Sequence, residues 1–388
     1  MNKLYILFYF IFINLTFATE PIIIASKSFS ESVLISEITA QLLEKKFNQT
    51  VIRKFGLGGT KVAFDALNNG GIHLYADYTG TGYVMILKMD GERDPEKVYQ
   101  IVKSEYERKW NITWSPPLGF NNTYALAVKR SDPRFKNITK VSQLSKKVSN
   151  YRYAAPYEFM ERKDGHSRFS KAYDLNFSPD KLLSMQAGLM YSAIKDNSVD
   201  MIIVYSTDGR NKAMDLKVLE DDLKFFPPYY ASLIAKKETI AKFPILKEVF
   251  LLLGNKITEE IMVNMNDDVD RLKKDPKNVA TNFLINQGLI SGENIQTKQL
   301  GTIDFFIGKR AYLFKLLKEH LAITFGALFF AVLVSIPTGV MLTRYPKMGK
   351  IVFPIINTIQ TIPSLALLGF LIPFMGIGFP PALLALFL

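Results

Sequence analysis

Short apolar runs alternate with stretches of helical spacing through roughly the first three quarters of the chain. "PIIIAS" is rich in β-branched residues and precedes "SESVLISEITAQLLEKKF", in which Leu34, Ile38 and Leu42 fall on one helical face. "VIRKF" in turn precedes the helical stretch "GGTKVAFDALNNG", and the apolar "IHLYADY" follows. Such alternation predicts parallel sheets flanked by helices, which is an α/β fold.

A second set of the same kind begins at "TYALAVKR". "RYAAPY" and "VDMIIVYS" are predicted strands, "LMYSAIKD" is a predicted helix, and the chain after Tyr230 is predicted to be mostly helical to about Gln287. Two α/β units joined by extended segments would leave a cleft between facing loops at their strand ends. The candidate crossing segments are "NNTYALAV" and "FFPPYYASL".

Two short motifs bear on how the first helices begin. Ser28 and Glu31 have the spacing of a capping box at the start of the first helix. "GLGGTK" lacks the Gly-Lys-Ser/Thr core of a phosphate loop, which argues against a nucleotide site. Its glycines suit a turn that starts a helix at Thr60, whose free N–H groups could attract a carboxylate.

The start of the chain has the pattern of a secretory signal. Lys3 is followed by an apolar run, and Thr16 and Ala18 stand where signal peptidase prefers small residues. We therefore predict a signal peptide over residues 1–18 and export of the domain that begins at residue 19; the alternative is an uncleaved membrane anchor.

The end of the chain is apolar enough for a membrane. No charged residue lies between His320 and Arg344, so residues 321–343 are predicted to span the bilayer. "IGKRAYLFKLLKEH" before this span is predicted to be an amphipathic helix at the interface. Residues 351–388 carry no charge, and "PFMGIGFPP" is expected to divide them into a full helix, a turn and the start of a third helix.

Charge and cysteine content narrow the class of protein. The 48 basic and 36 acidic residues give a net charge of +12, which would raise nucleic acid as a partner, but the basic residues are scattered and the chain is predicted to be exported. We expect a solvated surface and no nucleic-acid partner. The absence of cysteine excludes disulfides, thiolate catalysis and a lipid-modified cysteine. The predicted C-terminal helices must then provide the membrane tether.

Candidate catalytic residues are sparse. His73, His166 and His320 are far apart in sequence, and no short motif pairs them with a serine nucleophile or with metal ligands. "DGHSRF" is the best candidate for an acid–base site, although a solvated loop is the simpler interpretation. We therefore predict neither a metal nor a cofactor, and no enzyme.

Tyrosines recur next to small or polar residues at predicted loops. Tyr78 stands in "YTGT", Tyr124 in "NNTYA", Tyr205 in "VYSTDG" and Tyr229 in "FFPPYY". Electron-rich ring faces around a cavity hold a quaternary ammonium, which has no N–H to donate. The neighbouring Tyr75 and Tyr230 alternate to the other side and are predicted to face the core.

Seven motifs, in this order, resemble the substrate-binding proteins of betaine, choline and carnitine ABC importers: "SKSFSE", "GLGGT", "YADYTGTG", "LGFNNTYALAV", "EFMERKDG", "VYSTDGR" and "FFPPYYAS". The segments from "HLAITFGALFF" onward resemble the permease subunit of these importers, as in fusions of receptor and permease. The resemblance implies a two-lobed periplasmic-binding-protein fold of type II followed by an all-α transmembrane region.

The resemblance also implies domain boundaries. Residues 19–295 would form the extracytoplasmic binding domain, with lobe 1 at about 19–124 and 229–295 and lobe 2 at about 125–228. Residues 296–320 would form a linker with the interfacial helix, and residues 321–388 an incomplete permease domain.

Ten residues are carried over as ligand-binding candidates. The tyrosines of the cage correspond to Tyr78, Tyr124, Tyr205 and Tyr229; Thr81, Arg162 and Lys27 would hold a ligand carboxylate, for which a guanidinium fork is geometrically suited. Asn122 would tie the lobes together, and Asp208 would either contact the ligand or cap the turn before Gly209. Ser30 of "SKSFSE" completes the set.

These features predict high-affinity binding of a quaternary ammonium zwitterion such as glycine betaine at the outer face of the inner (cytoplasmic) membrane. Delivery to the importer would require the remaining permease helices and a separate cytoplasmic ATPase subunit. The alternatives are ergothioneine uptake by the same cage, a tethered receptor without a transport role, and an exported hydrolase that uses His166.

Overall fold

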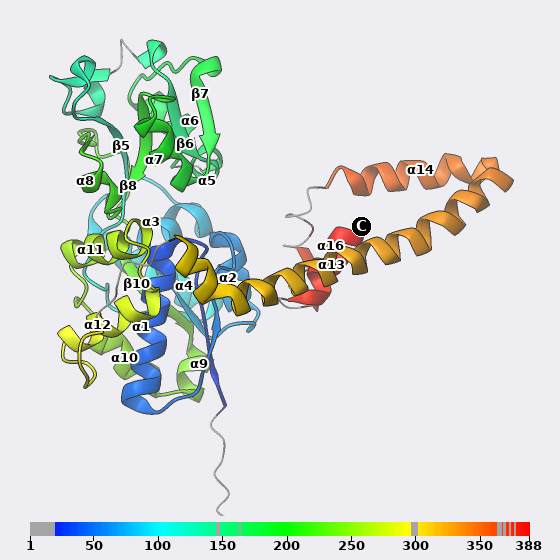
Figure 1. Ribbon diagram of the computed structural model, residues 1–388, viewed down its shortest axis with the longest axis horizontal. Helices are drawn as coiled ribbons and strands as arrows, with labels where there is room; N and C mark the ends of the chain where they lie inside the picture. The colour runs from blue at the N-terminus through cyan, green and yellow to red at the C-terminus, as the bar shows by residue number, and fades with distance from the viewer. Residues whose placement is uncertain are drawn as a thin grey trace, which may run out of the picture.

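The computed structural model describes residues 20–144, 148–162, 164–295, 302–362, 367, 370–371, 374–375 and 378–388 (Figure 1). The predicted signal peptide lies outside the described residues, as does the start of the predicted linker at 296–301. Between residues 20 and 295 the chain forms two α/β lobes, each built on its own five-stranded sheet.

The first sheet has the strand order β2-β1-β3-β10-β4. Strand β1 pairs in parallel with β2 and β3, whereas β10 is antiparallel to both β3 and β4. The strands of this sheet are β1 (Ile22–Ala25), β2 (Val51–Lys54), β3 (Leu74–Tyr78), β4 (Ile112–Trp114) and β10 (Ala231–Lys236).

The second sheet repeats this arrangement with the order β7-β6-β8-β5-β9. Strand β6 is parallel to β7 and β8, and β5 is antiparallel to β8 and β9. In each sheet the antiparallel strand is therefore the one by which the chain enters from the other lobe. The strands are β5 (Tyr124–Lys129), β6 (Tyr153–Pro156), β7 (Leu182–Met185), β8 (Met201–Tyr205) and β9 (Leu216–Val218).

Helices cover both faces of the first sheet. The predicted apolar face of α1 is confirmed, since Leu34, Ile38 and Leu42 are completely buried. The capping box is wrong, because α1 begins at Ser30 after Phe29 and has no side-chain cap. The helices of this lobe are α1 (Ser30–Phe47), α2 (Thr60–Asn68), α3 (Thr79–Thr81), the π-helix η1 (Gly82–Ile86), α4 (Pro95–Trp110), α9 (Lys237–Lys242), α10 (Ile245–Leu253), α11 (Glu259–Asp270) and α12 (Pro276–Asn286).

The segment after Tyr230 is helical for most of its length to Asn286, as predicted, but it begins with a strand. Residues 231–236 form β10, which lies between β3 and β4 and pairs with both. The helices α9 to α12 follow it, and α11 and α12 pack on α1.

The second lobe has shorter helices. They are α5 (Tyr157–Glu161), α6 (His166–Ala172), α7 (Ala187–Lys195) and α8 (Arg210–Ala213), with 3-10 turns at Pro133–Phe135, Val141–Leu144, Val148–Asn150 and Pro179–Lys181. Tyr153, Phe159 and Phe169 are completely buried in this lobe and form its aromatic core.

Two segments connect the lobes, and they pair with each other. Asn121 and Tyr230 form an isolated antiparallel bridge. The backbone N–H of Asn122 donates to the carbonyl of Tyr229 at 3.1 Å, and the N–H of Tyr229 donates to Oδ1 of Asn121 at 2.7 Å. These segments belong to the predicted crossings, and their pairing fixes Tyr229 beside the start of β5.

The C-terminal part is helical. Helix α13 (Thr302–Arg344) runs without a break, so the predicted interfacial helix and the predicted span are parts of one helix. Its segment Leu313–Arg344 is long and apolar enough to cross a membrane, by length and composition. Helix α14 (Pro346–Gln360) follows after Tyr345, and α16 (Phe379–Phe387) packs on α13, where Gly326 faces Leu383.

Candidate ligand-binding site

The four predicted cage tyrosines meet between the lobes. Tyr78 ends β3, Tyr124 starts β5, Tyr205 ends β8 and Tyr229 precedes β10. Tyr124 and Tyr205 face each other across the β5–β8 ladder with ring centroids 5.1 Å apart, and the ring of Tyr229 meets Tyr124 edge-on at 5.8 Å. Strand ends and crossing segments of both lobes therefore place these rings in one cluster.

A cavity of about 50 Å³ lies among these rings. Eight of the ten predicted site residues line it, together with Phe29, Thr60 and Glu158; the eight are Lys27, Tyr78, Thr81, Asn122, Tyr124, Arg162, Tyr205 and Tyr229. The other two, Ser30 and Asp208, line a larger cavity of about 510 Å³. The two cavities share Phe29, Asn122, Glu158 and Tyr205 and so adjoin each other.

Arg162 is buried directly after α5, and its guanidinium makes cation–π contacts with two of the rings. Its guanidinium carbon lies 5.4 Å from the ring centroid of Tyr124 and 5.8 Å from that of Tyr229. Its Nε and Nη2 donate to the carboxylate of Asp164 at 2.7 and 2.6 Å, and the hydroxyl of Tyr229 also donates to Asp164. Asp164, which was not predicted from the sequence, therefore orients both Arg162 and Tyr229.

Lys27 is paired within its own lobe. Its Nζ donates to Oδ1 of Asp77 at 2.6 Å and lies 5.0 Å from the ring centroid of Tyr78. Asp77 also accepts from the hydroxyl of Tyr75, which is fully buried as predicted; Tyr230 is half-buried. Lys27 thus supplies a buried positive charge beside the ring of Tyr78, with Asp77 as its counter-ion.

Small residues after β3 admit the ring of Tyr229. A Cβ added to Gly80 would lie 2.6 Å from a carbon of that ring, which is too close for any side chain. Thr79 donates from Oγ1 to the carbonyl of Pro228 at 2.8 Å and accepts from the N–H of Tyr230 at 3.0 Å. The "TGTG" sequence therefore lets the returning crossing segment pack closely against β3, next to the buried Thr81.

Asp208 and Ser30 belong to a cluster of polar side chains that lines the larger cavity. Asp208 accepts from the backbone N–H of Arg210 at 3.0 Å and from its guanidinium at 2.9 and 2.6 Å. Ser30 donates to Asp270, whose pKa is raised by burial, and Arg210 lies 3.9 Å from Asp270. Of the two roles considered for Asp208, the turn-stabilising contact is present, and its carboxylate also lines the cavity.

Glu31 has a role that differs from the helix cap predicted for it. Its carboxylate accepts hydrogen bonds from Tyr78, Asn122, Thr207 and Asn266 at 2.5 to 2.8 Å. Burial raises the pKa of Glu31, and these four donors work in the opposite direction. Because its partners are distant in sequence, the spacing from Ser28 indicated only a helix cap.

His166 lies outside both cavities. Its ring stacks on Tyr153 at 5.6 Å and lies 5.6 Å from Phe177, and burial lowers its pKa. Among the residues that the structure describes, no group of three or more His, Cys, Asp or Glu could hold a metal ion. In "DGHSRF", Asp164 accepts hydrogen bonds from Arg162 and the ring of His166 packs on Tyr153.

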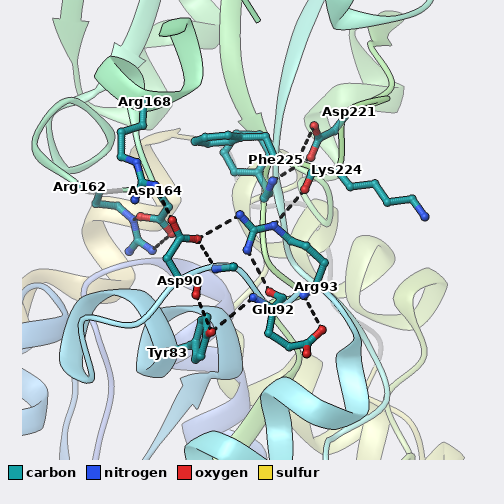
Figure 2. A network of polar contacts seen from close by, with 12 residues as sticks. Tyr83, Asp90, Glu92, Arg93, Arg162, Asp164, Arg168, Asp221, Lys224 and Phe225 are labelled. Carbon is teal, nitrogen blue, oxygen red and sulfur yellow. Dashed lines mark hydrogen bonds and ion pairs between the residues drawn. The ribbon is translucent and has the colours of Figure 1, made fainter. Parts of the chain in front are cut away.

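A network of charged side chains also joins the lobes (Figure 2). Asp90, in the loop between η1 and α4, accepts from Arg93 of its own lobe at 3.1 Å and from Arg168 of α6 at 2.5 Å. Arg93 donates in turn to the carbonyl of Lys224, which precedes the second crossing. The lobes are therefore in polar contact both at Glu31 and at Asp90.

Comparison with known proteins yields relatives of two kinds. The chain is 37% identical over 271 residues to the ergothioneine transport permease/ergothioneine binding protein EgtU of Helicobacter pylori; the match covers 70% of this chain and 48% of that protein. The chain thus spans about half the length of this relative. It is also 46% identical over 70 residues, 18% of this chain and 32% of the relative, to the carnitine transport permease protein OpuCB of Listeria monocytogenes.

A solved structure and a family match agree with the fold. The crystal structure of a glycine betaine/carnitine/choline ABC transporter superposes with a TM-score of 0.61 at 33% identity, covering 70% of this chain and 100% of that one. This likeness confirms the predicted two-lobed binding-protein fold. Residues 20–286 match the family described as the substrate binding domain of the ABC-type glycine betaine transport system. The chain therefore belongs to this family of ABC-transporter substrate-binding domains.

Proposed function

We propose that this chain binds a quaternary ammonium zwitterion of the betaine type in its tyrosine cluster and delivers it to an ABC importer. The observation that carries the proposal is the convergence of Tyr78, Tyr124, Tyr205 and Tyr229 on one cavity between the lobes. A trimethylammonium group has no N–H, so ring faces are the groups that best stabilise it. Each ring would contribute about 0.5 to 2 kcal/mol, depending on how completely it is desolvated.

The positive charges near the rings favour a ligand that also carries a carboxylate. Arg162 and Lys27 line the same cavity as the tyrosines, and each already has one carboxylate partner, Asp164 and Asp77 respectively. Nη1 of Arg162 has a long contact of 3.5 Å to Glu158. That nitrogen is the group we assign to a ligand carboxylate, because Nε and Nη2 are occupied by Asp164.

Cavity size bears on the choice among ligands. The cavity among the rings measures about 50 Å³, well below the roughly 300 Å³ of a typical small-molecule pocket. It would hold one small group, with the rest of the ligand in the adjoining cavity of about 510 Å³. A larger betaine would use that space, so ergothioneine, which the Helicobacter pylori relative binds according to its name, is the second candidate ligand.

The C-terminal helices support a membrane-bound role. Helix α13 is long enough to span a bilayer, and the side chains of Phe325, Phe329 and Ile336 on it are exposed. We place residues 20–295 outside the cytoplasmic membrane and α13, α14 and α16 in a permease unit. A separate ATPase subunit would supply the energy for transport, and the chain would bind its ligand without chemical turnover.

Calorimetric titration of the full chain in lipid nanodiscs tests the proposal. Glycine betaine, carnitine, choline and ergothioneine are compared on the wild type, on Tyr205→Ala and on a matched control, Tyr151→Ala. Tyr151 is also a half-buried tyrosine of lobe 2, but it packs on Phe135 away from the cavity. Binding that Tyr205→Ala abolishes and Tyr151→Ala retains would support the cage; no binding of any of the four would refute it.

A further inference from the structure

The carboxylate of Glu31 joins parts of both lobes. Its Oε1 accepts from the hydroxyl of Tyr78 at 2.6 Å and from Nδ2 of Asn122 at 2.7 Å. Its Oε2 accepts from Oγ1 of Thr207 at 2.5 Å and from Nδ2 of Asn266 at 2.8 Å. The donors come from a cage ring, a crossing segment, the second lobe and α11.

We propose that Glu31 is a positioning residue that couples the ring of Tyr78 to the closed arrangement of the lobes. This inference rests on the proposed function, because it assigns Tyr78 to the ligand cage. Glu31 itself lines the larger cavity, whereas Tyr78 lines the smaller one.

Glu31 and two of its donors are almost completely buried, so the loss of a hydrogen bond between them would cost free energy. Glu31 is 3% exposed, and Tyr78 and Thr207 are 4% and 1% exposed. Loss of a hydrogen-bond donor to a buried carboxylate is costly unless another donor takes its place. An ionised carboxylate accepts without donating, so it orients the hydroxyl of Tyr78 and the amides of Asn122 and Asn266 toward itself.

Separation of the lobes would remove one of the four donors. Glu31, Tyr78 and Asn266 belong to the first lobe and Asn122 to the crossing segment, whereas Thr207 follows β8 of the second lobe. Nδ2 of Asn266 also donates to the backbone carbonyl of Thr207 at 3.0 Å, which strengthens the same inter-lobe contact. Opening would therefore leave Oε2 of Glu31 with Asn266 as the remaining one of its two donors, and so would weaken the network that orients Tyr78.

The test measures the distance between the lobes in the full chain in nanodiscs. Because the chain has no cysteine, cysteines introduced at the exposed Lys46 of α1 and Lys171 of α6 give two unique spin-label sites. Electron–electron distances are measured with and without each of glycine betaine, carnitine, choline and ergothioneine. Ligand dissociation rates are measured by stopped flow on the same samples.

We expect Glu31→Gln and Thr207→Val to shift the label distances to longer values and to raise the dissociation rate about tenfold. The double variant should be no worse than Glu31→Gln alone, because both changes act through one contact. Glu37→Gln is the matched control: Glu37 is about as buried on α1, but its carboxylate pairs with Arg53, and neither residue lines either of the two cavities. It should leave distances and rates unchanged.

Two results would overturn the inference. One is a Glu31→Gln chain that melts earlier but retains wild-type distances and dissociation rates, which would mean a purely structural role. The other is an additive effect of the double variant. If the wild type binds none of the four ligands, the proposed function fails. The ligand-free label distances still test the coupling: longer distances in Glu31→Gln support it, and distances equal to those of the wild type refute it.

Discussion

Arg168 of the second lobe donates to Asp90 of the first lobe with 2.5 Å between Nη2 and Oδ2, so an ion pair joins the lobes outside the two cavities described above (Figure 2). The two side chains are 52% and 33% exposed. Nη2 of Arg93 also donates to Oδ1 of Asp90 at 3.1 Å. Burial acts to raise the pKa of Asp90, but the hydrogen bonds from Gly91, Arg93 and Arg168 lower it. The pair is therefore formed at neutral pH but accessible to solvent and salt.

We predict that Arg168→Ala accelerates ligand dissociation by up to about fivefold at low salt, because exposed pairs contribute about 0.2 to 1 kcal/mol. High salt should accelerate dissociation from the wild type and leave the variant nearly unaffected, since screening removes the same attraction. Stopped-flow dissociation at two ionic strengths measures both effects. Arg130→Ala is the control, because Arg130 is similarly exposed and pairs with Asp215 inside the second lobe; an equal effect there would contradict the prediction.

Arg162→Lys should change ligand preference more than overall binding. Lysine keeps the positive charge but cannot form the planar fork, so carboxylated ligands should lose about tenfold or more in affinity, while choline should lose less. The measured quantity is the ratio of the carnitine and choline dissociation constants. A disturbance around Asp164 that weakens both ligands equally would leave this ratio unchanged. An unchanged ratio would place the ligand carboxylate elsewhere. Arg152→Lys, which alters an arginine paired with Asp200 away from the cavities, should leave the ratio as it is.

The tyrosines of the proposed cage could be singled out from the sequence because Tyr78, Tyr124 and Tyr205 stand at strand ends and Tyr229 lies in the crossing segment before β10. Tyr78 is followed by "TGTG", and the structure shows why: Gly80 gives room to the ring of Tyr229. The roles of Glu31 and Asp164 could not be predicted in the same way. Thr207 and Asn266 are 176 and 235 positions away from Glu31, and short-range spacing carries no information about such contacts.

Two element boundaries were missed from the sequence for physical reasons. Strand β10, "ASLIAK", lies between β3 and β4 and is buried on both faces, so it lacks the alternation that would distinguish a half-exposed strand from the helices that follow. Helix α13 continues through "KRAYLFKLLKEH", because no glycine or proline separates the charged and apolar parts before Gly326. The change from charged to apolar residues at position 320 suggested a boundary between two helices, but the helix is continuous there.

Asp200 should stabilise the second lobe in a pH-dependent way. Burial acts against its charge, but hydrogen bonds from Arg152 and Arg134 lower its pKa from 3.8 to about 2. A carboxyl with a lower pKa in the folded state stabilises the fold above the unfolded pKa and loses this contribution as the pH falls toward the folded pKa. After allowance for the exposure of both arginines, the contribution is about 1 to 2 kcal/mol at neutral pH.

The measurement is urea unfolding of the wild type and Asp200→Asn at a series of pH values. The difference in unfolding free energy should be constant above pH 3.8 and shrink between pH 3.8 and about 2. Asp196→Asn, at an exposed position after α7, serves as the control and should show little difference throughout. A difference for Asp200→Asn that persists undiminished at the lowest pH would mean that its charge is not the cause.

Gly209 should set how closely the lobes can approach. An added Cβ there would lie 2.4 Å from Cβ and 2.8 Å from Cα of Asp267, which belongs to α11 of the first lobe. The φ of Gly209 is −59°, so alanine fits the local backbone, and the conflict lies across the lobe contact alone. Gly209→Ala should therefore favour separated lobes and raise the apparent dissociation constant about tenfold or more, because the closed state becomes less populated.

The distance between labels at positions 46 and 171 would report this opening directly in the ligand-free chain. Gly59→Ala is the control, since no atom lies within 4 Å of its added Cβ, and it should leave both distance and affinity near wild type. Saturating ligand should bring the Gly209→Ala distances only partly toward those of the wild type, because the backbone of α11 still blocks full contact. Wild-type distances in Gly209→Ala would mean that α11 shifts to accommodate the methyl group, and that this contact does not limit closure.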